Sequence, residues 1–197
     1  MARTQRERRE ATVARLLDAG IATIVEVGYA RASAKTIAER AGVSDGALFR
    51  HFDTMGDFMA ATAREVLHRQ LDLFAKRVSE IPDDGPAVGA VLTVLRDITR
   101  SPTNAVLYEL MIAARTDALL RATLRDVLEE YSTKIYETAR VLPGADDVPD
   151  EIFPAVVATM TTSFDGAAMV RAVLPQPDLD EQQVPVLMAL LQSVTAG

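Results

Sequence analysis

The chain has 197 residues, 49% of them hydrophobic, enough to bury a core as one large domain or as a small domain joined to a larger one. It contains no cysteine, which excludes disulfides, thiolate metal sites and cysteine nucleophiles, and which fits a reducing cytoplasm. No apolar run approaches the roughly 18 residues that a membrane span needs, and none follows the basic amino-terminus. We therefore expect a soluble cytoplasmic protein with no membrane partner.

The net charge of −7 is spread unevenly along the chain. Residues 1–53 carry nine Arg and Lys against seven Asp and Glu, whereas residues 54–197 carry twelve against twenty-one. A basic segment joined to an acidic body is typical of a small module that faces nucleic acid. Because the excess is only two charges, this interpretation needs support from motifs.

Apolar residues recur at helical spacing and no β alternation appears, so we expect an all-α fold. In the amino-terminal part, the pattern predicts helices over residues 6–27, 34–40, 45–51 and 55–81. Gly28 is expected to close the first helix, and Ser33, Ser44 and Thr54 to cap the next three. Turn-rich segments then delimit five more helices, over residues 87–100, 104–116, 118–141, 150–174 and 180–195.

The two short helices over 34–40 and 45–51 are typical of a helix-turn-helix, with Gly42 supplying the positive φ that the turn requires and Val43 filling the space between the helices. Leu48 and Phe52, four residues apart, are expected to face inward. The side chains then turned outward are Ser44, Asp45, Ala47, Arg50 and His51. Small residues followed by cationic donors suit a helix that lies in a DNA major groove. An ordinary helical hairpin with a solvated polar face is the alternative that this pattern leaves open.

The run Thr36 to Ser44, TIAERAGVS, followed by Gly46, Leu48, His51 and Phe52, resembles the DNA-binding signature of the TetR family of transcriptional repressors. The resemblance covers about residues 11–58 and matches the rest of the chain in architecture only. It implies a helix-turn-helix DNA-binding domain over residues 1–53. It also implies a helical ligand-binding domain over residues 54–197, which dimerises through its last two helices.

The same resemblance implies which residues meet DNA: Lys35, Thr36, Ser44, Asp45, Gly46, Ala47, Phe49, Arg50, His51 and Thr54. Arg50 would reach a base or a phosphate, and His51 the backbone. Phe49 stands where the family usually has tyrosine, and Met55 where it usually has lysine. Neither side chain can donate to a phosphate, and each such missing donor should lower non-specific affinity and flatten its salt dependence by roughly one unit of slope.

Six residues of the acidic body are candidates for contact with a small-molecule effector. Flexible apolar side chains with a few polar groups build a pocket between helices, although they also build a plain core. Because the resemblance implies a pocket, we expect some of this set to line one for an apolar or amphipathic effector: Tyr108, Met111, Ile112, Arg115, Met160 and Phe164. The sequence does not name the effector.

Two other classes of protein fit the sequence less well. An enzyme has little support, because the chain has two histidines, no cysteine and no glycine-rich phosphate loop. Glu65, His68 and Asp72 share a helical face and could hold a metal, but a solvated polar face is the simpler interpretation. We expect no catalytic residue, metal or cofactor. A scaffold that binds only protein would require the pattern from Ser33 to Phe52 to be accidental.

The sequence thus predicts a homodimeric repressor that binds a pseudo-palindromic DNA operator and is released by a small effector.

Overall fold

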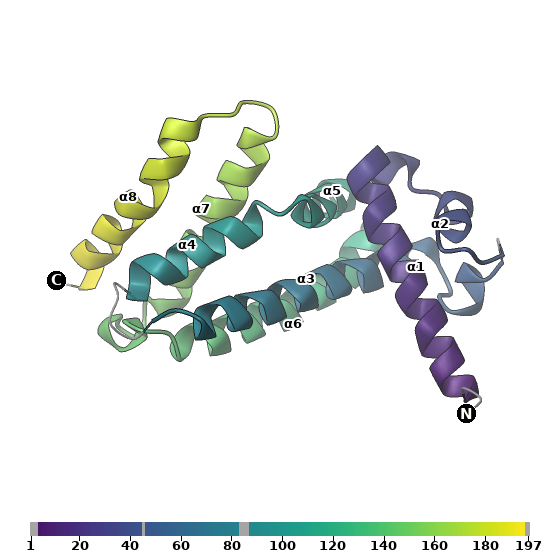
Figure 1. Ribbon diagram of the computed structural model, residues 1–197, viewed down its shortest axis with the longest axis horizontal. Coiled ribbons are helices and arrows are strands. Elements are labelled where there is room, and N and C mark those ends of the chain that lie inside the picture. Colours follow the sequence, from purple (N-terminus) through teal and green to yellow (C-terminus); the bar gives the residue numbers. More distant parts are fainter. Residues whose placement is uncertain (1–3, 45, 83–86, 196–197) are drawn as a thin grey trace. The chain divides into compact units, whose positions relative to one another are not determined.

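The computed structural model describes residues 4–44, 46–82 and 87–195, and within them the secondary structure consists of helices alone (Figure 1). The predicted all-α fold is confirmed. The chain forms two compact units, Met1–His68 with Pro102–Glu129 and Arg69–Ser101 with Glu130–Gly197. Two long helices, α3 (Met55–Ser79) and α6 (Ala118–Arg140), contribute residues to both units. None of the described helices is long and apolar enough to cross a bilayer.

In the first unit, α1 (Gln5–Val27) begins with a capping box. The Thr4 hydroxyl accepts the Glu7 backbone N–H at 3.2 Å, and the Glu7 carboxylate accepts the Thr4 N–H at 2.9 Å. The helix ends where predicted, at Gly28, whose N–H donates to the Ile24 carbonyl at 2.9 Å. A short 3₁₀ helix, η1 (Tyr29–Arg31), then leads to α2 (Ala34–Arg40), whose bounds match the sequence prediction.

The turn after α2 has the expected geometry. Gly42 adopts a φ of +64°, a left-handed conformation that side-chain-bearing residues rarely take. Its N–H donates to the Glu39 carbonyl at 3.1 Å, and the Val43 N–H donates to the Ala38 carbonyl at 3.0 Å. These two bonds satisfy carbonyls at the end of α2 that would otherwise lack a partner.

The predicted helix over residues 45–51 is shorter and tighter in the structure, which has the 3₁₀ helix η2 (Leu48–Arg50) with turns on either side. The Ala47 N–H donates to the Ser44 carbonyl at 2.8 Å and the His51 N–H to the Leu48 carbonyl at 3.0 Å, so these bonds span three residues. A segment this short that includes Gly46 gains little from α-helical bonds, whose first turn is costly to form. Asp45 lies outside the described residues.

The interior of the first unit holds fully buried side chains from all its long elements. The Phe52 ring meets the Phe58 ring edge-on, with centroids 5.1 Å apart. The capping box predicted at the start of α3 is present, because the Thr54 hydroxyl accepts the Asp57 N–H at 3.0 Å and the Asp57 carboxylate accepts the Thr54 N–H at 3.0 Å. The largest buried side chains are Leu16, Ile24, Ile37, Leu48, Phe58, Met59, Val66, Val106, Leu110 and Leu120. The last three come from α5 (Ala105–Ala114) and α6, and η3 (Pro102–Asn104) precedes α5.

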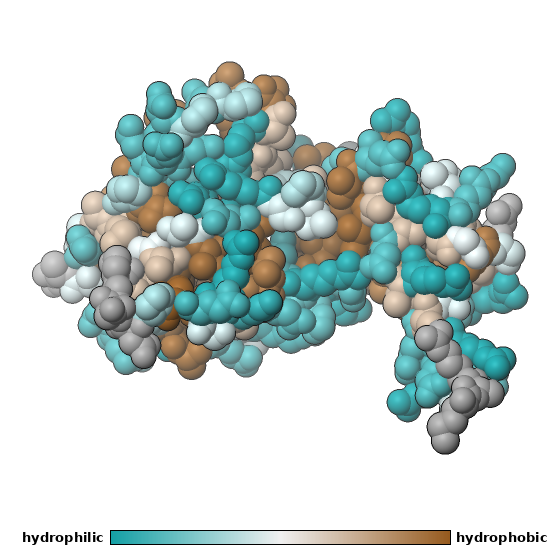
Figure 2. Space-filling view, in the orientation of Figure 1, coloured by the Kyte–Doolittle hydropathy of each residue, from teal (hydrophilic) through white to brown (hydrophobic). Residues whose placement is uncertain are grey.

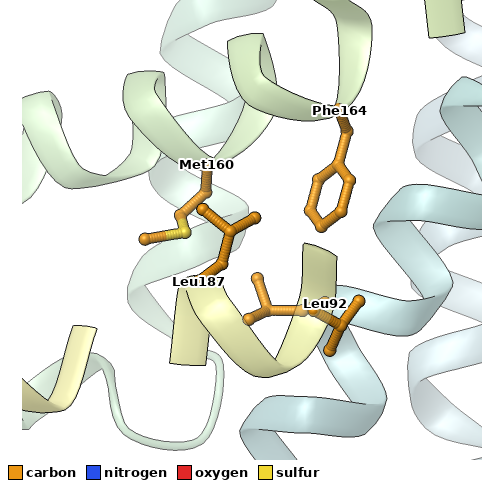
Figure 3. Packing of buried hydrophobic residues seen from close by; sticks show 5 residues of the cluster. Leu92, Met160, Phe164 and Leu187 are labelled. Carbon is orange, nitrogen blue, oxygen red and sulfur yellow. The ribbon is translucent and has the colours of Figure 1, made fainter. Parts of the chain in front are cut away.

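The second unit is built from α4 (Ala87–Thr99), η4 (Ala145–Asp147), α7 (Phe153–Arg171) and α8 (Pro177–Thr195). Figure 3 shows Leu92 of α4, Met160 and Phe164 of α7, and Leu187 of α8 converging on one apolar cluster, which also includes Val184. The last two helices differ from the predicted ranges 150–174 and 180–195. Prolines explain both starts, because Pro154 and Pro177 occupy first-turn positions, where a missing N–H costs nothing.

A polar junction joins the same helices. The Asp180 carboxylate at the start of α8 accepts a hydrogen bond from Arg171 of α7 at 3.0 Å and lies 3.2 Å from Nη2 of Arg100, which follows α4. The Asp180 side chain is 18% exposed, so this ion pairing is sheltered from solvent. One carboxylate thus connects three helices of the unit.

Candidate nucleic-acid interface

The exposed side of α2 carries two of the predicted DNA contacts. Lys35 is 72% exposed, and its Nζ lies 4.0 Å from a carboxylate oxygen of Glu39, a pair that solvent weakens. The Thr36 hydroxyl lies 2.8 Å from the Ser33 hydroxyl, which also accepts the Thr36 N–H at 3.2 Å. Both side chains start from a capped helix end, so the ammonium and the hydroxyl project from a well-defined backbone.

Around η2, the roles of Ser44 and Ala47 differ from those predicted. The Arg50 Nη2 donates to the Ser44 hydroxyl at 2.9 Å, so Ser44 orients this guanidinium instead of capping a helix. Gly46 and Phe49 are exposed, the latter by 51%. Ala47 was predicted to face outward, but it is only 4% exposed. A 3₁₀ helix has three residues per turn in place of 3.6, which shifts the inward-facing side.

His51 lies at the edge of this surface, and its Nδ1 is buried without a hydrogen-bond partner within the described residues. Burial lowers the pKa of His51, and the positive charges of Arg9 and Arg50 lower it further. The free protein therefore favours the neutral imidazole. Thr54, exposed at the start of α3, donates its hydroxyl to the Asp57 carboxylate at 2.7 Å.

A depression of about 460 Å³ opens beside η2 and is bounded on one side by α1. Arg9 lies one turn before Thr12 on α1, and its charge reaches His51. The sequence pattern did not predict that these two residues of α1 lie beside the predicted DNA contacts. The available signal was the basic run at the amino-terminus, but the position of α1 beside η2 could not be read from it. The lining residues are Thr12, Val43, Ser44, Ala47, Arg50 and His51.

The six predicted effector contacts divide between the two compact units. Tyr108, Met111, Ile112 and Arg115 lie on α5 or just after it, in the first unit. The Tyr108 hydroxyl accepts a hydrogen bond from Asn104 at 2.6 Å, while the other three are exposed. Met160 and Phe164 pack together in the apolar core of the second unit, 8% and 1% exposed. A pocket that contains both groups stays a prediction.

Among the described residues, no three His, Asp or Glu side chains gather as they would around a metal ion. Glu65 and His68 belong to the first unit and Asp72 to the second, although all three lie on α3. The positions of these three residues therefore give no support to a metal site on α3.

Comparisons with known proteins agree with the helix-turn-helix geometry. The sequence model described as bacterial regulatory proteins, tetR family, matches residues 16–62. An uncharacterised HTH-type transcriptional regulator of Mycobacterium tuberculosis (strain H37Rv) is 68% identical over 197 residues, 100% of both chains. The chain belongs to the TetR family. It is therefore a DNA-binding transcriptional regulator and not an enzyme, and the predicted family resemblance is confirmed.

Two more distant proteins are similar to this chain over most of their length. The HTH-type transcriptional repressor AcnR of Corynebacterium glutamicum is 28% identical over 154 residues, 76% of this chain and 77% of AcnR. The crystal structure of the multidrug binding protein EbrR, complexed with imidazole, superposes with a TM-score of 0.67 at 25% identity, covering 93% of this chain and 94% of EbrR. The similarity to EbrR extends over both compact units of this TetR-family regulator.

Proposed function

We propose that this TetR-family regulator is a cytoplasmic, homodimeric repressor that binds a pseudo-palindromic DNA operator and is released by a small apolar or amphipathic effector. The observation that carries the proposal is the surface formed by α2, the Gly42 turn and η2. It exposes Lys35, Thr36 and Arg50 from a buried support of Ile37 and Leu48. The name of AcnR, a transcriptional repressor, supports repression as the direction of control.

Residues 1–53 would form the DNA-binding part and residues 54–197 the ligand-binding and dimerisation part. Asp45, if it faces the groove, would act as an acceptor from a cytosine amino group, because its charge repels phosphate. Arg50 would read a base edge or hold a phosphate, and Lys35 would grip the backbone. Both protomers would insert η2 into successive major grooves, about 34–36 Å apart.

The dimer is supported by apolar side chains that the single chain leaves in solvent on the last two helices. Those more than half exposed on α7, α8 and the segment between them are Val170, Val173, Leu174, Leu179, Val186 and Leu190. Exposed apolar groups of this number are unusual on a monomer and typical of a surface that pairs with another chain. Two antiparallel helices from each protomer would make a four-helix interface about a two-fold axis.

The proposed release by an effector is supported by a contact between α5 and η1, the short helix that connects α1 with α2. The Glu109 carboxylate of α5 accepts the backbone N–H of Tyr29, eighty residues away. Gly28 precedes that N–H, and a Cβ at Gly28 would lie 3.2 Å from the same carboxylate. An effector that shifts α5 would therefore move η1, and with it the start of α2. The candidate effector contacts on α5, Tyr108 and Met111, flank Glu109 closely along the chain.

The operator is sought by sequencing genomic DNA recovered with the purified protein, followed by gel-shift titration of the enriched fragments. We expect a symmetric site bound at nanomolar concentration and repression of a reporter placed behind it. Recovery of unrelated fragments, bound no better than random duplex, would refute sequence-specific regulation.

The effector is sought by thermal-shift screening of small apolar and amphipathic compounds. Calorimetric titration of a hit, with and without operator, then measures coupling, for which a change in affinity of about 5–150-fold is ordinary. Operator and effector must weaken each other by the same factor. Equal effector affinities in the two titrations would mean that the compound binds without switching.

A further inference from the structure

The depression beside η2 places α1 within reach of the surface that carries Arg50. Thr12 lines it from α1, and Ser44, Ala47 and His51 line it from the segment around η2. Ala47 is buried and contributes only a methyl group to this lining. The depression is open to solvent and has room for a tetrahedral oxyanion with its attached sugars.

Two guanidinium groups lie near this depression and act on His51. Arg9 and Arg50 have no carboxylate partner within the described residues. Three other cations of the same unit do form ion pairs, namely Arg6–Glu10, Lys35–Glu39 and Arg40–Glu26. The charges of Arg9 and Arg50 both act on His51, lowering its pKa in addition to the effect of burial. Two guanidinium groups, Arg9 and Arg50, thus place positive charge near the His51 ring in a chain whose net charge is −7.

Hydrogen bonding within the protein already fixes two of the lining groups. The Thr12 hydroxyl donates to the Arg8 carbonyl at 2.9 Å, and the Arg50 Nη2 donates to Ser44. The Arg9 guanidinium and the His51 ring are not held in this way among the residues that the structure describes, and the His51 Nδ1 is buried without a partner there. Figure 2 shows the amino-terminal half of α1 covered by hydrophilic side chains, as expected of a surface that meets a polar partner.

We propose that this depression seats a backbone phosphate of DNA, held by Arg9 of α1 and His51 next to η2, so that α1 is part of the DNA interface. The inference rests on the proposed operator binding and adds to it a phosphate contact outside the helix-turn-helix. Phosphate is the favoured occupant because unpaired guanidinium and imidazole donors recognise anionic oxygens and because the duplex presents such oxygens at regular intervals. A contact of this kind sets the register of η2 on DNA and leaves Arg50, oriented by Ser44, for a base edge.

The first experiment measures the salt dependence of binding to a random duplex and to the recovered operator, for the wild type, Arg9→Gln and Arg15→Gln. Arg15 lies on the exposed side of the same helix and controls for net charge and helix content. We expect Arg9→Gln to lower affinity on both duplexes alike and to flatten the salt slope by about 0.9 for each protomer bound. Arg15→Gln should keep the wild-type slope. Equal slopes for all three proteins, or equal changes for the two variants, would overturn the inference.

The second experiment locates the phosphate. Operator duplexes carry one neutral methylphosphonate at each position in turn and are titrated with the wild type and with Arg9→Gln. One position in each half-site should weaken the wild type about threefold or more and leave Arg9→Gln unchanged, because that variant has no guanidinium to meet the phosphate. If each substitution lowered the affinity of both proteins by the same factor, the proposed phosphate site would be refuted. A wild type that binds no duplex at all would instead refute the proposed operator binding, and the inference with it.

Discussion

Arg50 and Lys35 have different surroundings, which suggests different roles at the DNA. Arg50 is oriented by a hydrogen bond to Ser44, whereas Lys35 lies on the exposed side of α2, where its Nζ is 4.0 Å from a carboxylate oxygen of Glu39. A guanidinium held in one direction suits a base edge, and a mobile ammonium suits phosphate.

We therefore expect Arg50→Ala to lose about 1–3 kcal/mol on the operator and less on random duplex, because a base contact discriminates between sequences. Lys35→Ala should weaken binding to all sequences alike. Fluorescence titration of the operator and of a random duplex gives the specificity ratio of each variant. Equal losses on both duplexes for Arg50→Ala would make that residue a backbone contact.

His51 should make the stability of the protein depend on pH. Its pKa in the folded chain lies below the ordinary value of about 6.5, so as the pH falls the unfolded chain binds a proton first. The contribution of His51 to the free energy of unfolding is complete above about pH 6.5 and is lost as the pH falls through the folded pKa. Urea denaturation at several pH values should show a smaller acid loss for His51→Gln than for the wild type. An equal acid loss for the two proteins would contradict this prediction.

A contact between elements connects α5 with η1, the short helix that precedes α2. The bond from the Tyr29 N–H to the Glu109 carboxylate is half-buried, so its removal would leave a backbone donor without a partner. Glu109→Ala should lower the free energy of unfolding by about 1–3 kcal/mol, as for a hydrogen bond to a charged group. Glu109→Gln, which keeps an acceptor oxygen, should lose less.

Glu10→Ala is the control for Glu109→Ala, since Glu10 is 63% exposed and pairs with Arg6 only at the surface, a contact worth less than about 1 kcal/mol. Operator titration of the same variants then tests coupling. If Glu109 transmits the movement of α5, both Glu109 variants should also reduce the factor by which an effector weakens operator binding. An unchanged factor would limit Glu109 to a role in stability.

At the scale of the whole molecule, apolar side chains on the last two helices are exposed in the single chain. Val186 and Leu190 lie one turn apart on α8, 54% and 53% exposed. We expect the wild type to sediment as a dimer at micromolar concentration. Leu190→Glu should shift it toward monomer, because it places a charge in an apolar interface.

Leu119→Glu is the matched control for the dimer, because Leu119 is 68% exposed on α6 in the other compact unit. It should leave the sedimentation coefficient unchanged. Leu190→Glu should also lose operator affinity, since a single η2 cannot occupy two half-sites. A wild type that sediments as a monomer with and without DNA would contradict the two-fold interface.

Much of the helical framework could be predicted from the sequence because its signals are local. The bounds of α2 match the prediction, and the caps at Ser33 and Thr54 involve residues three apart. Gly42 takes the positive φ that the turn required. The TetR signature spans one continuous stretch for the same reason, so the family and the exposed positions of Lys35 and Arg50 followed from it.

Contacts between residues distant in sequence were beyond prediction, because helical periodicity says which side of an element is apolar and not which element covers it. It could not place Arg9 and Thr12 of α1 beside His51, or Glu109 against Tyr29. The burial of Ala47 depends on η2 being a 3₁₀ helix, a choice made where the chain packs and not by its apolar pattern. These packing contacts require the folded chain, since each gains its free energy from surfaces that meet only when whole helices have come together.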